Sequence, residues 1–237
     1  MADRILSRCA AVGVLGLCLL GMSPIARAGI LVDASVGGAP TGVNYANFDG
    51  LPLGAAGGTS NGITVSFGGD GQAVQGSVSN LYAAPFLSSG NGAPFGDPNN
   101  GPDATTYLTT GTGSVTLALP GEEKYVGLLW GSVDSYNTLS LYNGSTLVGT
   151  VTGTDVTSSA NGNQGELGTF YVNITSTDSF NTIVATSTQN AFEFDNVAFN
   201  TSAVPEPSSI MLGLIGMMGA ATFTQMRRKG VSVGNKR

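Results

Sequence analysis

Oxygen-bearing side chains recur at alternate positions of one loop near the middle of the chain, Asp97-Pro98-Asn99-Asn100-Gly101-Pro102-Asp103. The carboxylates of Asp97 and Asp103 and the amide of Asn99 are hard oxygen ligands, and their spacing suits calcium. The segment lacks the bidentate glutamate and the fuller D-x-D-x-D-G pattern of a calcium loop. Because turn chemistry alone selects the same residue types, the segment is interpreted either as a calcium site or as a solvated turn.

The single tryptophan of the chain marks a second candidate site. Trp130 ends an apolar stretch that we predict to be a strand, and Asp134 and Asn137 fall in the turn that follows. An exposed tryptophan beside these two polar residues could stack on a sugar ring and hydrogen-bond its hydroxyl groups. The alternative is that Trp130 belongs to the core and that Asp134 and Asn137 only close a turn.

Two side chains on which many enzymes depend are missing from the central part of the chain. The sequence has no histidine, which excludes a histidine general base, the Ser-His-Asp and Cys-His arrangements and the usual zinc sites. Its two cysteines, Cys9 and Cys18, lie near the N-terminus, so the remainder has no disulfide, thiol nucleophile or thiolate metal site. A glycoside hydrolase needs only two carboxylates about 5 to 9 Å apart, but nothing marks such a pair among the acidic residues.

Acidic residues dominate the charge of the central part. Between residues 29 and 204, nine Asp and four Glu stand against a single cation, Lys124, which gives a net charge of about −12. Such a surface repels nucleic acid and anionic lipid, so neither is expected as a partner. The same surface attracts cations, and calcium is the first candidate among the abundant extracellular ones.

The pattern between the two ends of the chain is all-β. Short runs rich in Val, Ile, Thr, Phe and Tyr are separated by Gly, Asn, Asp and Pro at spacings of roughly eight to twelve residues, which is typical of a sandwich or jelly roll. No segment has helical periodicity. We predict strands at residues 30–36, 63–68, 73–78, 106–109, 114–119, 125–133, 138–142, 146–152, 168–175, 182–187 and 191–199.

The most specific local prediction is a hairpin around Asn143-Gly144. This pair supplies the two residues with positive φ that a type I′ turn requires. Leu139 and Leu141 then lie on one face of the first strand. The register across the turn pairs them either with Leu147 and Gly149 or with Val148 and Thr150.

The last predicted strand, 191–199, breaks its own alternation. Phe192 and Phe194 lie on one face, whereas Phe199 falls on the other. A β-bulge near Asp195-Asn196 is expected to return the later apolar residues to the buried face.

The N-terminus has the features of a secretory signal peptide. Arg4 and Arg8 precede an apolar stretch at residues 9–20, and Ala26-Arg27-Ala28 supplies the small-x-small cleavage site at Ala26 and Ala28. We therefore expect a signal peptide over residues 1–28 and a single exported domain over residues 29–203. A lipoprotein signal at Cys18 is the alternative, disfavoured by the bulky leucines before it.

Residues 204–237 combine three features in a fixed order. The spacer Pro205-Glu206-Pro207 keeps the backbone extended, because proline lacks an N–H and disfavours helix in the residue before it. Residues 210–226 carry no formal charge and just reach the length needed to cross a hydrocarbon core roughly 30 Å thick. The basic residues that follow, beginning with Arg227-Arg228-Lys229, place the C-terminus in the cytoplasm. An ordinary single-pass anchor with a proline hinge is the alternative interpretation.

This arrangement resembles the PEP-CTERM sorting signal of bacterial proteins, which a membrane transpeptidase called exosortase recognises and processes. The sequence Phe-Asp-Asn-Val-x-Phe at residues 194–199 also resembles the closing strand of PEP-CTERM ectodomains and the last strand of jelly-roll carbohydrate-binding modules. The latter resemblance implies a structural calcium ligand at Asp195. The alternatives for Asp195 are a surface carboxylate on an edge strand or a residue that forms the bulge.

We therefore expect an all-β protein, a single jelly-roll-like antiparallel β-sandwich with an N-terminal signal helix and a C-terminal transmembrane helix. The resemblance implies an intermediate anchored in the inner membrane, and then a place on the cell surface or in the extracellular matrix. The protein is expected to be non-catalytic and to associate with exopolysaccharide, with calcium as the candidate cofactor. A secreted glycoside hydrolase that uses two carboxylates and a purely structural coat or adhesin protein are the alternatives.

Overall fold

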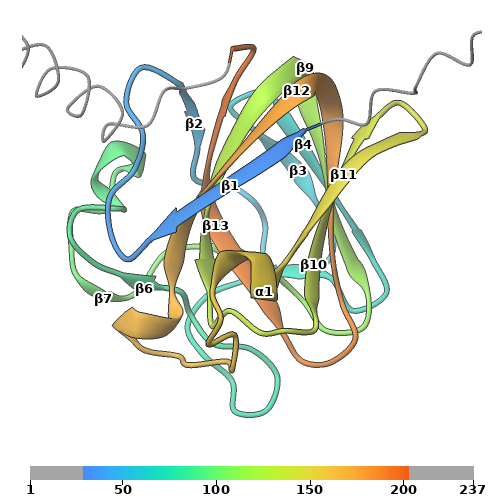
Figure 1. Cartoon of the computed structure of the whole chain (residues 1–237). Helices are drawn as coiled ribbons and strands as arrows, with labels where there is room; N and C mark the ends of the chain where they lie inside the picture. The colour runs from blue at the N-terminus through green and yellow to red at the C-terminus, as the bar shows by residue number, and fades with distance from the viewer. Residues whose placement is uncertain (1–28, 203–237) are drawn as a thin grey trace, which may run out of the picture.

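The chain has 237 residues, and a computed structural model describes residues 29–202 (Figure 1). The predicted signal peptide with Ala26 and Ala28, the sorting motif Pro205-Glu206-Pro207 and both predicted terminal helices lie outside the described residues. Between residues 29 and 202, no helix has the length and apolar character that crossing a membrane requires. The strands are β1 (Ile30–Ser35), β2 (Asn44–Ala46), β3 (Gly58–Ser60), β4 (Ile63–Gly68), β5 (Gln72–Val74), β6 (Phe86–Leu87), β7 (Gly101–Pro102), β8 (Tyr107–Thr110), β9 (Ser114–Gly131), β10 (Asn137–Asn143), β11 (Thr146–Thr152), β12 (Phe170–Ser187) and β13 (Phe192–Asn200). Short helical turns are α1 (Gly153–Val156), η1 (Ala93–Phe95) and η2 (Glu166–Gly168).

Two long strands, β9 and β12, form the centre of one large antiparallel sheet and bend so that they belong to two layers. In the first layer, residues 114–118 of β9 pair with β4 and with the end of β12, which in turn pairs with β10 and the β11 hairpin. In the second layer, residues 125–131 of β9 pair with β13 and with the start of β12, whose other neighbour is β1. Figure 1 shows β1 crossing the long strands on the near side of the molecule.

Each of these long strands joins two strands that the sequence predicts separately. The predicted break in β9 falls at Pro120-Gly121, where a proline would normally interrupt a strand. Pairing with β4 ends at Ala118, and pairing with β13 begins at Tyr125. Pro120 lies between these two paired regions, where neither strand needs its missing N–H. The bend between the two layers therefore sits at the one place where the strand tolerates proline.

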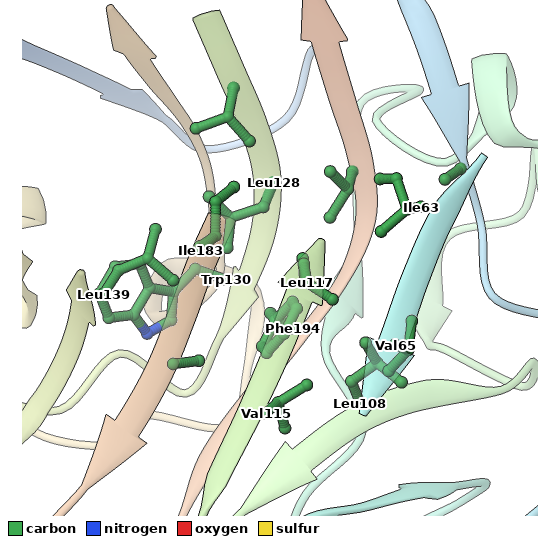
Figure 2. Packing of buried hydrophobic residues seen from close by; sticks show 14 of the residues in the cluster. Ile63, Val65, Leu108, Val115, Leu117, Leu128, Trp130, Leu139, Ile183 and Phe194 are labelled. Atoms are coloured by element: carbon green, nitrogen blue, oxygen red, sulfur yellow. The ribbon is translucent and has the colours of Figure 1, made fainter. Parts of the chain in front are cut away.

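The main hydrophobic core fills the space between the two layers (Figure 2). Trp130 of β9 lies near Leu139 and Ile183 of the opposite layer, and Phe194 of β13 lies near Leu117. All of these side chains are almost completely buried. The all-β prediction is thus confirmed, and the predicted strands 63–68 and 146–152 agree with β4 and β11 at both ends.

The predicted hairpin forms, but its turn differs from the expected one. Asn143 is the last residue of β10, and the turn consists of Gly144 and Ser145. Of these two only Gly144 has a positive φ, 57°, which fits a type II′ turn and not the predicted type I′. Leu139 and Leu141 share the buried face as predicted, but they pair with Val151 and Gly149, so neither of the two predicted registers is right.

The predicted bulge in the last strand is confirmed. The register of β13 against β9 shifts between Asp195 and Ala198, and Asn196 has a φ of 53°. Phe192 and Phe194 before the shift and Phe199 after it all belong to the main core. The bulge therefore restores a single buried face, as the sequence requires.

The connection between β5 and β8, residues 75–106, covers the face of β13 that points away from the core. We call it the covering segment. Pro85 lies so close to Gly131 that a β-carbon on that glycine would approach the Pro85 Cα to 2.7 Å. Leu87 and Phe95 pack against Leu129 and Tyr171 in a second, smaller core. Because of this cover, side chains on the outer face of β13 are buried although they point away from the main core.

Candidate functional site

A polar pocket of about 510 Å³ opens where the covering segment meets the ends of β9 and β13. Four stretches of chain line it: the covering segment, the β9–β10 turn, the loop before η2 and the start of β13. The lining residues are Ser77, Val78, Ser79, Asn80, Leu81, Tyr82, Ser132, Asp134, Tyr136, Asn161, Gly162, Gln164, Asn190, Ala191 and Glu193. Hydroxyl and amide groups predominate, and none of these side chains is cationic.

Asp134 lies at the centre of the loop contacts around this pocket. The Tyr136 hydroxyl donates to Asp134 Oδ2 at 2.7 Å and is also 3.0 Å from the carbonyl oxygen of Asn190. Gly162, with a φ of 70°, approaches so closely that a β-carbon there would lie 2.8 Å from both carboxylate oxygens. Burial raises the pKa of Asp134, and the hydrogen bond from Tyr136 opposes that rise. The Tyr136 hydroxyl, held by the Asp134 carboxylate, thus links the β9–β10 turn to Asn190 just before β13.

Glu193 of β13 is the second acidic side chain of the pocket, and it is 2 % exposed. Its Oε1 accepts the backbone N–H of Ala83 at 2.8 Å, and its Oε2 accepts the hydroxyl of Ser132 at 2.7 Å. Burial raises the pKa of Glu193 to about 7. The nearby charge of Asp134 also raises this pKa, whereas the two hydrogen bonds lower it. One oxygen of Glu193 therefore holds the covering segment against β13, and the other holds the β9–β10 turn.

Two of the three residues predicted to bind a sugar are wrong for that role, because the structure places them inside the protein. Trp130 is 0 % exposed and stacks on Phe192 with ring centroids 4.3 Å apart, so it is the core residue of the alternative interpretation. Asn137 is also 0 % exposed, and its Oδ1 accepts the Ser187 hydroxyl at 2.9 Å. Of the three, Asp134 alone lines the pocket.

The predicted calcium ligands divide into two groups. Asp97 and Asn99 belong to a local turn, in which Asp97 Oδ1 accepts the backbone N–H of Asn99 at 3.0 Å and its side-chain amide at 2.8 Å. Asp103 is 2 % exposed and Asp195 is 1 % exposed, and their carboxyl groups lie against each other. Asp195 is on a strand with neighbours on both sides, so the edge-strand alternative is wrong. Among residues 29–202, no group of three acidic side chains forms a metal cage by itself.

The alternation of β13 carries a signal for Glu193 in the sequence itself. In a strand whose Phe192 and Phe194 point inward, Glu193 and Asp195 must share the opposite face. Acidic residues on such a face normally meet solvent, and only the covering segment makes them buried. Tyr82 and Gln164 reach the pocket from distant loops, and no spacing in the sequence connects them with Asp134.

The described residues thus form an acidic all-β domain. Its concave polar site contains two carboxylates and no cationic side chain. No protein-family model matches the chain, and no curated protein matches its sequence significantly.

Proposed function

We propose that this chain is an exported, exosortase-sorted protein of the cell surface or extracellular matrix that associates with exopolysaccharide without catalysis. In this proposal the described domain is a jelly-roll-like β-sandwich, and residues 204–237 form the sorting signal. The membrane holds the protein through its C-terminal segment until exosortase removes it. The polar pocket beside Asp134 is the binding site.

The composition of the pocket carries the binding part of the proposal. A sugar presents many hydroxyl groups and small apolar faces, so it is recognised by amides, hydroxyls and aromatic rings at fixed positions. The pocket supplies the amides of Asn80, Asn161 and Gln164 and the rings of Tyr82 and Tyr136. An anionic ligand such as a phosphate would meet two carboxylates and no cationic side chain, so an uncharged glycan fits better.

A glycoside hydrolase is the second candidate function for this pocket, because Glu193 has a pKa of about 7 and lies near a second carboxylate, Asp134. A general acid must reach the glycosidic oxygen with its proton. Glu193 is buried, and each of its oxygens already accepts a hydrogen bond from the protein. This arrangement favours a structural role for Glu193, and hence the non-catalytic proposal.

Replacing Tyr82 with alanine is expected to weaken glycan binding about 5- to 30-fold, which corresponds to the roughly 1–2 kcal/mol of one aromatic contact. Tyr82 lines the pocket, and its ring is held edge-on against Tyr107 at 6.4 Å between centroids. A glycan array with the full-length chain in mild detergent identifies the ligand, and calorimetry compares the variants.

Tyr142→Ala is the matched control, because Tyr142 is a half-buried tyrosine of β10 outside the pocket. The proposed binding site is contradicted if the unaltered protein binds no glycan on the array. It is also contradicted if Tyr82→Ala binds the glycan as tightly as Tyr142→Ala. Release of reducing sugar would instead support the hydrolase.

Replacing Pro205, Glu206 and Pro207 together with alanine is expected to prevent removal of the C-terminal segment in a host that has exosortase. An immunoblot of membrane and medium fractions should show the unaltered chain shortened and the variant at full length in the membrane. Ser202→Ala, just before the motif, serves as control and should be processed normally. Equal processing of the variant and the unaltered chain would rule out recognition through this motif.

A further inference from the structure

Three carboxylate oxygens are buried side by side without a hydrogen-bond donor. Both oxygens of Asp195 and the Oδ2 of Asp103 are inaccessible to solvent and have no partner. The remaining oxygen, Asp103 Oδ1, accepts the backbone N–H of Thr105 at 2.8 Å and its hydroxyl at 2.6 Å. Such isolated oxygens are costly, because burial removes the water that would otherwise solvate them.

Other carboxylates of the same domain show that this arrangement is unusual. Asp70 is exposed, yet its two oxygens accept three backbone N–H groups and one hydroxyl from residues 110–113. Glu193, on the same face of β13 as Asp195, has a donor for each oxygen. The domain therefore supplies hydrogen bonds to these carboxylates, whereas Asp195 has only the nearby backbone N–H of Asn196, which makes no hydrogen bond with it.

The part of the chain that the structure describes has no cationic side chain to place there. Lys124 is the single cationic residue between residues 29 and 202, and it is exposed. Asp195 pairs with Leu129 on β9, five residues beyond Lys124. At about 3.3 Å per residue this is roughly 16 Å along the strand, too far for an ion pair.

We propose that Asp103 and Asp195 bind a calcium ion that joins the covering segment to β13. A single proton shared by the two carboxyl groups would satisfy one pair of oxygens and leave the third without a partner. A calcium ion takes six to eight oxygen ligands and accepts carboxylates in either one- or two-oxygen contact, so it satisfies all three. Its other ligands must be oxygens other than acidic side chains, because no third acidic side chain among the described residues joins the pair.

Calcium fits this site better than magnesium does. Magnesium requires near-ideal octahedral geometry and retains several water molecules. Asp103 and Asp195 are 2 % and 1 % exposed, which leaves little room for such a hydrated ion. Asp49, an exposed carboxylate near both residues, adds negative charge on the solvent side and favours entry of a divalent cation.

Protons compete with the ion at this site. Burial raises the pKa of Asp195 well above its ordinary value, the neighbouring Asp103 and Asp49 raise it further, and the nearby backbone N–H of Asn196 opposes the rise. Tyr171 is a further titratable group beside Asp195. A proton on Asp195 is thus the alternative to the ion, and a calcium titration distinguishes the two.

The test uses the full-length chain in mild detergent, freed of metal with EDTA and titrated with calcium chloride alone. Calorimetry should show one ion per chain. At about 100 times the dissociation constant, the midpoint of thermal unfolding should rise by about 5–10 °C. Magnesium at the same concentration should give a clearly smaller shift. None of these measurements involves a glycan, so their outcome does not depend on whether the polar pocket binds one.

Asp195→Asn provides the decisive variant. Its amide can donate to Asp103, so in EDTA the variant is expected to be at least as stable as the unaltered chain, while its response to calcium is lost. Asp97→Asn makes the same change in the same covering segment and should keep the full response, because Asp97 already bonds to Asn99. Terbium luminescence excited through tyrosine gives a second readout on the unaltered chain, since Tyr171 lies beside Asp195.

Two results overturn the proposal. One is the absence of calcium binding and of a thermal shift in the unaltered chain, which would leave a proton shared by the two carboxyl groups. The other is a calcium response that Asp195→Asn retains or that Asp97→Asn abolishes, which would place the ion in the exposed loop. Loss of the response in Asp195→Asn alone, with terbium luminescence in the unaltered chain, supports the assignment.

Discussion

Replacing Trp130 with alanine is expected to lower the free energy of unfolding by about 3–5 kcal/mol, the usual cost of removing a large aromatic side chain from a core. Trp130 is 0 % exposed, stacks on Phe192, and fills the space between the two layers near Leu139 and Ile183 (Figure 2). Both layers lose contacts at once, so neither can close the cavity alone. Denaturant unfolding followed by circular dichroism measures the change.

Trp130→Phe separates packing from polarity at the same position. The indole N–H of Trp130 has no hydrogen-bond partner, and phenylalanine removes that group while keeping a ring against Phe192. We expect a loss on the order of 1–2 kcal/mol for this change. Leu147→Ala, at a side chain that is 52 % exposed, should change stability by less than about 0.5 kcal/mol. A Trp130→Ala variant as stable as Leu147→Ala would contradict the position of Trp130 in the core.

Glu193 is expected to make the domain less stable as the pH rises. Its pKa is about 7 in the folded protein, against an ordinary value of 4.5 in an unfolded chain. Between these values the folded state binds more protons than the unfolded state, so its stabilising contribution is complete below pH 4.5 and is lost as the pH rises through 7. The difference in pKa corresponds to about 3 kcal/mol. Thermal and denaturant unfolding between about pH 4.5 and 8, in EDTA, measures the slope.

Glu193→Gln should flatten this pH dependence, because the amide stays neutral and can still bond to Ala83 and Ser132. Asp134 and Asp195 retain effects of the same sign, since burial also raises their pKa values. Asp70 acts in the opposite sense below pH 3.8, because hydrogen bonds from residues 110–113 lower its pKa despite partial burial. Glu166→Gln, at an exposed side chain, is the matched control. Equal slopes for Glu193→Gln and Glu166→Gln would show that Glu193 titrates in the ordinary way.

Much of the fold could be predicted from the sequence because the strands alternate strongly and end at glycine, asparagine or proline. The hairpin at β10 and β11 and the bulge after Asp195 follow from local patterns alone. The joining of strands across Pro120 could not be predicted, since it depends on where the partners β4 and β13 end and begin. The short strands β2, β3, β6 and β7 were also missed, because two or three residues carry no periodicity.

The candidate sites were harder to predict, because burial decides them and the sequence gives burial only where neighbours are known. Asp134 could be predicted from its place in the turn after β9. For Trp130, the local sequence cannot distinguish a sugar-binding residue from a core residue. Asp103 and Asp195 were predicted as ligands of separate sites, and the structure brings them together through the covering segment. Asp49 carried no signal at all, because its relation to Asp103 exists only in the folded chain.

The pairing of β1 with β12 and of β2 with β13 joins segments about 150 residues apart in the chain. Contacts over such separations give a high contact order, and proteins of this kind fold slowly because long loops must close first. The first strand therefore remains without its partner until residues 171–176 are available, and the last strand completes the second layer only at residue 200. A domain built in this way cannot complete its fold progressively from the N-terminus. In the proposed export of this chain, the domain would therefore cross the membrane unfolded and close only afterwards.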